Sequence, residues 1–544
     1  MSAAATVAAE RQARRAGGGT LAGTLTMIRF FLRRERIRIP LYVLVMVALI
    51  ASTAAQSEAL YPTQAERDEY AATVAGNPGL IALVGPTYRV TAVGGDVAWQ
   101  WGAIGGVIAA LISMFIIGRH TRAEEQSGRS ELVRASVLGR YASTAAALVV
   151  VAVANVALAA AIAVAMIGLG QPAAGSVALG ASLGGVGLAF AGVAILAMQV
   201  NQSTGGAYGV VGAAIGLAYA LRAAGDVGDG TLSWLSPIGW GQAMRPFANE
   251  RWWPLLLMLA FGAVLVVAAF ALLERRDDGA GLVAPRPGPA HASRAMTRPL
   301  GFAVRLSRVA VLGWAAGLFL GGLSIGLTGQ DADQILGDSP EVDKLFSQAG
   351  GSLVDNYLAV SLVSMGLIAC GFAIQAVLRM RSEETSGHLE PLLATALARR
   401  RWVASHVAVA AIGTVVVLGA TGLGTGIADA LASHDAGRVA VLTGSALALV
   451  PAVWVLAAVA VALFGLVPRA APAAWGVLGA CFLLAYLGPL LSLPDWVMDI
   501  SPFTHVPLLP ADDFALGPLA VLTAVAAAFT AAGLVGFRRR DVPG

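Results

Sequence analysis

Two short charged segments of this chain carry the same residue types at the same spacing. Both match the pattern RxEExSGxxE, the first from Arg122 to Glu131 and the second, 259 residues later, from Arg381 to Glu390. Each lies between two long apolar stretches, so each is predicted to form a polar loop. Apolar residues that face lipid exchange freely with one another, and identity concentrated in a polar loop therefore indicates that the loop has a function. The alternative is a solvated, amphipathic connector that stayed similar after an internal duplication.

The repeated pattern makes the chain two copies of one unit and defines its candidate functional residues. The candidates of the two loops are Arg122, Glu124, Glu125, Ser127, Gly128 and Glu131 in the first copy, and Arg381, Glu383, Glu384, Ser386, Gly387 and Glu390 in the second.

Several kinds of chemistry are excluded by the residues that the chain lacks. Its single lysine, Lys344, is not part of a Gly-Lys-Ser/Thr sequence, so the chain supplies no phosphate-binding loop of the ATPase type. It contains neither HExxH nor GxSxG. Its two cysteines, Cys370 and Cys481, lie in apolar stretches and offer no disulfide framework and no metal-ligand spacing. We therefore expect no catalytic site, metal or cofactor in this chain.

The composition is that of a membrane protein. Apolar residues make up 57% of the chain and charged residues only 12%, and the mean hydropathy is +0.74. Runs of about 18 or more apolar residues are long enough to cross the bilayer as helices. The sequence predicts an all-α integral membrane protein with twelve spans, near 40–55, 97–118, 141–168, 173–198, 205–221 and 252–273, and near 309–328, 356–378, 402–428, 439–467, 470–493 and 515–537.

The distribution of basic residues predicts the orientation of these spans. Of the 36 Lys and Arg residues, 29 lie in the termini and in alternate loops on one side, which the positive-inside rule assigns to the cytoplasm. Both termini and both RxEExSGxxE loops are therefore predicted to be cytoplasmic. The isoelectric point near 9.3 reflects this topology and gives no indication of nucleic-acid binding.

The two halves have the same predicted layout. Residues 1–274 form a first six-span unit, residues 275–299 a cytoplasmic linker rich in Pro and Gly, and residues 300–544 a second six-span unit. Because six is even, the copies run parallel, and such repeats are related by a pseudo-twofold axis along the membrane normal. The axis is the expected place of a cavity.

Each half is predicted to begin with a basic helix at the membrane surface. Residues 26–39 place Phe31 and other apolar residues on one helical face and Arg33 and Arg36 on the opposite face. Arg305 and Arg308 repeat the spacing of these arginines before the first span of the second half.

Polar residues in or beside the spans are candidates for contact with a transported molecule. Asp96 and Asp355 are 259 residues apart and begin the second span of each half, where a carboxylate can cap free N–H groups of the helix. Lining the outer exit of the path is the alternative role for this pair. The remaining polar candidates are Gln100, Asn356 and Gln375. The pairs Gly180/Gly184 and Gly212/Gly216 have a spacing that permits close helix packing.

The charged loops, with a basic residue soon after each (Arg140 and Arg399), resemble the coupling-loop region of exporter-type ABC transporter permeases. The surrounding layout is similar as well: an amphipathic helix, six spans per unit and short outer helices before the last span. The likeness is greatest to double-length bacterial permeases of the kind that exports polyketide antibiotics. The second loop departs from the first at Pro391 and Leu393.

This resemblance implies an alternating-access exporter driven by other subunits. Two copies of a cytoplasmic ABC-type ATP-binding subunit, which would hold ATP and Mg, would grip the loops through Glu124, Glu125 and Glu131 and through their counterparts. Gly128 and Gly387 would break the loop helices so that the loops can bend into a groove of the partner, and a simple helix stop is the alternative. The implied substrate is a hydrophobic small molecule such as an antibiotic, a drug or a lipid-like compound, and the implied location is a bacterial cell membrane.

Two other classes of function stay open. A secondary, ion-coupled carrier fits the hydrophobicity and the parallel repeats, but we expect no buried Asp or Glu relay inside the spans, which such carriers require. A membrane-embedded enzyme would need a catalytic constellation, and none is recognisable.

Overall fold

The computed structural model describes residues 19–128, 138–276, 281–282, 290–329, 352–488 and 493–541. All regular secondary structure in these ranges is helical, and twelve of the helices are long and apolar enough to cross a membrane. The predicted class, an all-α membrane protein with twelve spans, is confirmed. The chain divides into two compact units, Met1–Pro287 and Gly288–Gly544, and the division falls inside the predicted linker.

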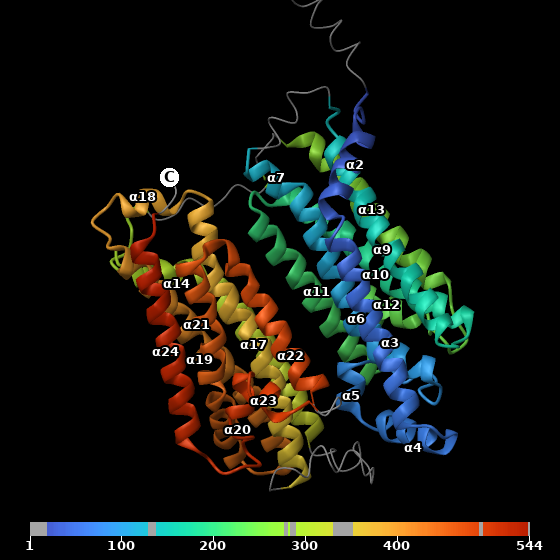
Figure 1. The fold of residues 1–544 in the computed structure, drawn as a ribbon. Helices are drawn as coiled ribbons and strands as arrows, with labels where there is room; N and C mark the ends of the chain where they lie inside the picture. The colour runs from blue at the N-terminus through green and yellow to red at the C-terminus, as the bar shows by residue number, and fades with distance from the viewer. Residues whose placement is uncertain are drawn as a thin grey trace, which may run out of the picture. The chain divides into compact units, whose positions relative to one another are not determined.

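The described part of the first unit contains six span-length helices, four short helices and a surface helix, which Figure 1 labels. The helix α2 (Thr24–Glu35) precedes the first span, and a 3-10 turn, η1 (Leu232–Leu235), precedes α12. The other helices are α3 (Arg38–Leu60), α4 (Gln64–Ala75), α5 (Pro78–Leu83), α6 (Val93–His120), α7 (Arg122–Gln126), α9 (Ala142–Gly168), α10 (Ala173–Val200), α11 (Thr204–Val227), α12 (Pro237–Ala243) and α13 (Trp253–Arg275).

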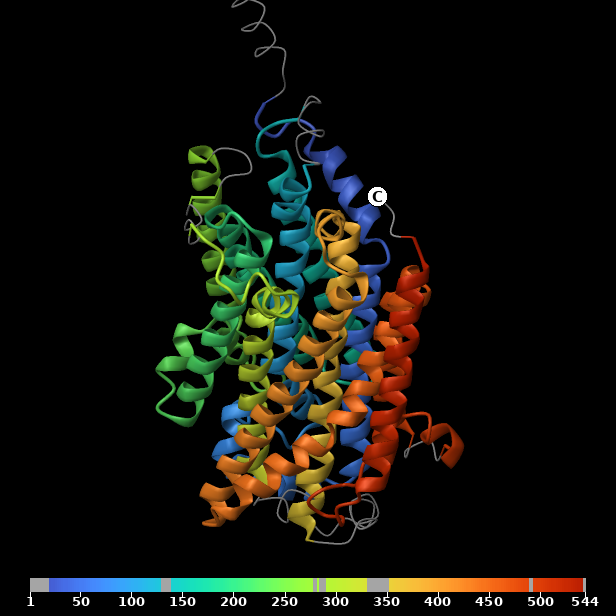
Figure 2. The same cartoon turned by 90° about the vertical axis from the view of Figure 1, so that its left-hand side faces the viewer.

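The second unit also has six spans, and Figure 2 shows its helices from the side. Its fourth span is divided into α20 and α21 because Pro451, at the start of α21, lacks the N–H that would continue α20. The elements are α14 (Pro299–Gly329), α17 (Leu353–Thr385), α18 (Leu389–Leu393), α19 (Arg399–Ser433), α20 (Gly437–Ala448), α21 (Val450–Leu466), η2 (Pro468–Ala473), α22 (Ala474–Leu487), α23 (Asp495–Met498), η3 (Pro502–His505) and α24 (Leu516–Arg539).

The predicted spans agree with the helices. The agreement includes the boundary between the fourth and fifth spans of each half, where the connecting loop is nearly uncharged. Residues 201–203 separate α10 from α11, and Val467 separates α21 from η2. The basic surface helix of the first half is also present, because α2 ends before α3 begins and Pro40 lies in the first turn of α3. The prediction of a separate surface helix in the second half is wrong. Arg305 and Arg308 lie within α14, which contains no proline after its first residue to interrupt it.

Small residues let α10 occupy the centre of the first unit, where it packs against α6, α9 and α13. A Cβ atom added to Gly180 would lie 2.2 Å from the carbonyl oxygen of Ala159 on α9, and one added to Gly184 would lie 3.0 Å from the carbonyl oxygen of Asn155. Gly212 and Gly216 on α11 have no such neighbour within 4 Å. Of the two glycine pairs with the same spacing, only the first makes a close helix crossing.

We expect Gly180→Ala to lower the stability of the protein by about 1–3 kcal/mol, because the new methyl group would force α9 and α10 apart. Gly216→Ala is the matched control in another span and should leave stability unchanged or raise it. Thermal unfolding of the purified variants in detergent checks this. Equal unfolding temperatures for the two variants would contradict the role assigned to the α9–α10 crossing.

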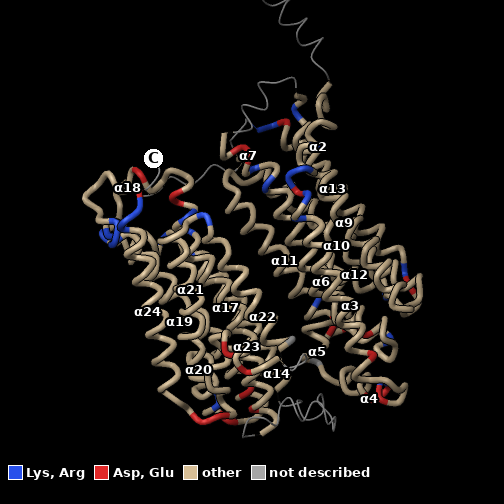
Figure 3. The backbone as a smooth tube through the Cα atoms, viewed as in Figure 1, with Lys and Arg blue, Asp and Glu red and all other residues tan. Residues whose placement is uncertain are grey.

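Within each unit, basic residues gather at the end that carries the charged loop (Figure 3). In the first unit this end holds α2 and α7, and Arg34 of α2 lies 2.5 Å from Glu124 of α7. In the second unit it holds α18 and the end of α24. The first described helix, α2, and the end of the last helix, α24, thus each lie at the end of their unit that carries the charged loop.

Candidate functional site

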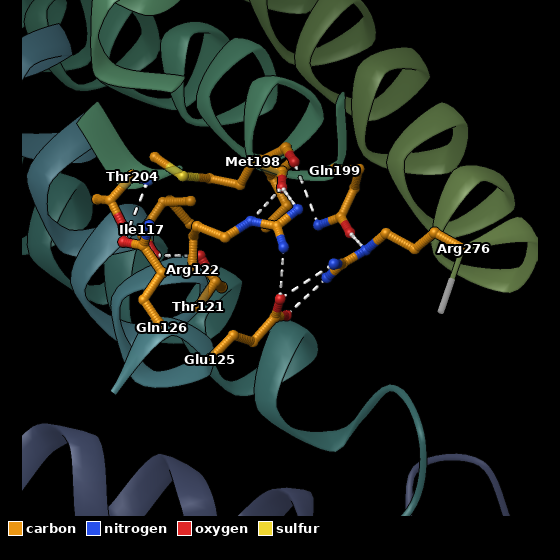
Figure 4. Close-up of polar contacts among 10 residues, drawn as sticks. Ile117, Thr121, Arg122, Glu125, Gln126, Met198, Gln199, Thr204 and Arg276 are labelled. Atoms are coloured by element: carbon orange, nitrogen blue, oxygen red, sulfur yellow. Dashed lines mark hydrogen bonds and ion pairs between the residues drawn. The ribbon is translucent and has the colours of Figure 1, made fainter. Parts of the chain in front are cut away.

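The first charged loop is held by a buried arginine. A break at Thr121, between α6 and α7, turns Arg122 toward the end of α10. Its Nε and Nη2 atoms donate hydrogen bonds to the carbonyl oxygen of Met198, at 3.1 and 2.7 Å, and its side chain is 1% exposed (Figure 4). The last carbonyl groups of a helix have no partner within the helix. Arg122 therefore caps α10 and fixes the loop to it.

A second arginine holds the loop from the opposite side. Arg276, the C-cap residue of α13, donates to both carboxylate oxygens of Glu125, at 2.6 and 3.0 Å, and its Nε donates to Gln199 at 2.8 Å (Figure 4). Arg122 donates to the same carboxylate at 2.7 Å. One glutamate of the loop thereby joins the ends of the second, fourth and sixth spans.

The second unit repeats the glutamate–arginine part of this arrangement. Arg540, the C-cap residue of α24, donates two hydrogen bonds of 2.6 Å to the two oxygens of Glu384. Its guanidinium group lies over the rings of Phe464 and Phe537, at 5.1 and 4.8 Å. A bidentate pair between planar groups is the strongest common form of ion pair.

A third arginine completes the repeat. Arg140, which precedes α9, donates to the carbonyl oxygen of Arg276 at 3.1 Å. Arg399, at the start of α19, donates to the carbonyl oxygen of Arg540 at 2.9 Å. Each unit thus contains the same chain of contacts: an arginine at the start of the third span, the last residue of the sixth span, and the second glutamate of the loop.

The pairing of the loop glutamates with another subunit stays a prediction, but two of these glutamates already have partners within the chain. Glu125 and Glu384 are satisfied within the chain, because the sixth span of each unit ends in an arginine that the sequence pattern did not single out. The sequence did contain a signal for this pairing, because basic residues lie directly after the last span of each half. Glu124 pairs with Arg34, and Glu383 lies near Arg379 and His388 at 3.6 and 3.5 Å.

The remaining loop candidates are exposed or lie outside the described residues. Ser127 and Ser386 are the C-cap residues of α7 and α17, and the glycines that follow them have φ of +70° and +72°. Gly128 and Gly387 thus follow the ends of α7 and α17 with the positive φ that favours glycine, and the bending of the loops into a partner's groove stays a prediction. Glu390 is exposed on α18, and Glu131 falls in the range that the structure does not describe.

We expect Arg276→Gln to lower stability by about 3 kcal/mol, because Glu125 would keep its charge in a partly buried position without its bidentate partner. The reversed pair, Glu125→Arg with Arg276→Glu, should recover part of the loss. Thermal unfolding of the single and double variants measures the coupling. Losses that simply add in the double variant would show that the pair does not act as a unit.

A buried carboxylate joins the surface helix to the same region. Glu35 of α2 is 1% exposed, accepts a hydrogen bond of 2.6 Å from Arg119 and lies 2.9 Å from Nε2 of His120. The ring of Phe31 stacks on His120 at 4.2 Å. Glu35 was not among the predicted site residues, although it is the one acidic residue of the basic segment 26–39. Through this contact α2 is attached to the residues that lead into α7.

The pKa of Glu35 shows how strongly this carboxylate is held. Burial alone raises the pKa, but hydrogen bonds from His120 and Arg119, together with the positive charge of Arg119, lower it from 4.5 to about 2. A carboxyl group whose pKa is lower in the folded protein stabilises the fold above its unfolded pKa. That contribution is lost as the pH falls through the folded value.

We therefore expect Glu35 to contribute its full stabilisation above about pH 4.5 and to lose it toward about pH 2. The unfolding of the wild-type protein and of Glu35→Gln, followed across this range, tests the expectation. The difference in stability between the two proteins should shrink as the pH falls. A difference independent of pH would contradict it.

Asp96 does not cap its helix, which corrects the more favoured of its two predicted roles. The N-cap residue of α6 is Ala92, and Asp96 lies in the first turn with 2% exposure. Both of its carboxylate oxygens accept from Gln100, at 3.1 and 3.0 Å, and one lies 3.4 Å from the hydroxyl of Tyr70. Among the described residues, no salt bridge to Asp96 is found.

Asp355 has a different environment, so the two aspartates are not equivalent. Ser352 is the N-cap residue of α17, and Asp355 lies 2.9 Å from Nη1 of Arg438. Arg438 also pairs with Asp429, which is fully buried near the end of α19, at 2.6 Å. Asp96 and Asp429 are thus buried acids in span-forming helices, whereas the expectation was that the spans contain no buried Asp or Glu relay. Both buried carboxylates lie in helix ends, opposite the charged loops, where polar partners reach them.

The other substrate-path candidates are also placed. Asn356 is buried and donates to the carbonyl oxygen of Ser352 at 3.2 Å. Gln375 accepts a hydrogen bond of 2.8 Å from Trp314 and lines a pocket of about 430 Å³ between α14, α17 and α22. Phe372 and Trp475 line the same pocket, which extends to Glu383 of the second loop.

Comparison with known proteins agrees with this architecture. Residues 296–538 match the family model described as the C-terminal domain of the multidrug efflux system permease Rv1217c. The chain is 41% identical over 529 residues to the multidrug efflux system permease protein Rv1217c of Mycobacterium tuberculosis, and the alignment covers 96% of each chain. Twelve span-length helices and this similarity define a multi-pass membrane permease. The chain belongs to the family of the multidrug efflux permease Rv1217c.

Proposed function

We propose that this chain is the membrane component of an ATP-driven exporter whose ATP-binding subunits are separate polypeptides. The observation that carries the proposal is the anchoring of both charged loops by the same three-residue arrangement. In each unit it connects the loop, the end of the sixth span and the start of the third span. A solvated connector does not require a buried or half-buried ion pair at the same position twice.

The anchoring suits a loop that transmits force. Movement of the first loop would carry the ends of α6, α10 and α13 with it, because Arg122 and Arg276 bind Glu125 and the end of α10 together. Two discrete arrangements of such rigid elements are what alternating access needs. In this proposal the loops contact the partner through exposed residues such as Ser127, Gly128 and Glu390, and the paired glutamates keep the loops rigid.

The proposal assigns one chain to two ATP-binding subunits, which would hold ATP and Mg, since each unit has one loop. The substrate would be a hydrophobic small molecule, as the name of the 41% identical relative, a multidrug efflux permease, supports. The pocket beside Gln375, which combines aromatic side chains with an amide and a carboxylate, is suited to such a compound. The basic, loop-bearing ends would face the cytoplasm of a bacterial cell.

An ion-coupled carrier is the second candidate, and Asp96 is the observation that favours it. A buried carboxylate surrounded by neutral donors can take up and release a proton. Export that follows the proton gradient in vesicles without any ATPase would support this alternative.

We expect the purified chain to show no ATP turnover and to gain compound-stimulated turnover only with its ATP-binding partner. Both are measured in proteoliposomes, and an ATPase variant without its phosphate-loop lysine is the control. The intact mass of the complex should correspond to one permease and two ATPase subunits. Turnover by the permease alone, or compound export without ATP, would refute the proposal.

A further inference from the structure

The two charged loops differ on the side that faces the turn between the fourth and fifth spans. In the first unit the loop is bonded directly to that turn. Besides the bonds from Arg122 to Met198, Oε1 of Gln126 accepts hydrogen bonds from the backbone and the hydroxyl of Thr204, at 3.3 and 2.5 Å. Gly281 also lies against this turn, close to Gln202. The first loop is thereby closed onto its own unit.

In the second unit a pocket of about 620 Å³ lies between the loop and the equivalent turn. The helix α17 continues through Arg381 without the break that Thr121 provides in the first unit. The Nη1 atom of Arg381 is buried and has no hydrogen-bond partner among the described residues. Thr385, which replaces Gln126, bonds to the carbonyl oxygen of Arg381 in its own helix.

The lining of this pocket has the composition of a protein-binding surface. Leu466 and Val467, at the end of α21, are 59% and 53% exposed, and they lie at the basic end of the unit. Charged residues of both signs surround them, among them Arg469 and Glu390. An apolar centre with a polar rim is the usual anatomy of a protein interface, where one buried apolar anchor contributes much of the affinity. A site for an anionic lipid headgroup would instead show an excess of positive charge.

We infer that the pocket beside the second loop receives an apolar side chain from one of the two ATP-binding subunits. This inference rests on the proposed function and deepens it. The two docking sites are unequal: the second unit offers a pocket in which a partner is anchored, and the first offers a loop already closed by its own contacts. One ATP-binding subunit consequently binds more tightly than the other.

The test uses the full chain with its ATP-binding partner. Val467→Trp fills the pocket from an exposed position, and Gln202→Trp, in the same turn of the first unit, is the matched control. Native mass spectrometry and titration measure the number of bound copies and their affinities. We expect wild type and Gln202→Trp to bind two copies, and Val467→Trp to lose at least tenfold in affinity for one of them.

Arg469→Glu and the conservative Arg469→Lys give a second test at the rim that does not depend on the folding of Val467→Trp. The first should weaken the same binding step and the second should not. Two copies bound with unchanged affinity by Val467→Trp and Arg469→Glu would overturn the inference, and this is also the result expected if lipid fills the pocket. Wild type that binds no ATP-binding subunit would instead refute the proposed function itself.

Discussion

An arginine at the end of the sixth span of each unit binds a glutamate of the charged loop, and the rest of the loop region is arranged around this ion pair. Arg276 and Arg540 lie where the helix dipole is negative and where the last carbonyl groups have no helical partner. A positive charge is favourable there before any side-chain partner is added. The glutamate then neutralises the arginine in a position that water reaches only in part, and removal of either partner would leave an unpaired charge.

The contacts around this pair explain how a short loop can be rigid. Arg122 of α7 and Arg276 at the end of α13 meet at Glu125, and Arg276 also binds Gln199 of α10. In the second unit, Glu384 of α17 binds Arg540 at the end of α24. A glycine with positive φ then ends each loop helix. The region that a partner subunit would push is consequently a fixed part of the bundle.

The two units have kept this pair and diverged around it. The break at Thr121 lets Arg122 cap α10, whereas the uninterrupted α17 leaves the Nη1 atom of Arg381 without a partner among the described residues. At the opposite ends, Asp96 is surrounded by neutral donors and Asp355 shares Arg438 with Asp429. A duplicated chain released from strict symmetry can assign different tasks to its halves, and both ends of the units show such differences.

The sequence by itself determined the membrane class, the twelve spans, their duplicated order and the ends of the loop helices. These follow from hydropathy over about 20 residues and from glycine and proline, which act through neighbouring residues only. Tertiary structure decided what each polar residue does. Glu125 finds Arg276 across 151 residues, Glu35 reaches His120, and only one of two identical glycine spacings packs against another helix. Such pairings depend on which helices become neighbours and how they are rotated, and a single chain's residue spacing carries no record of either.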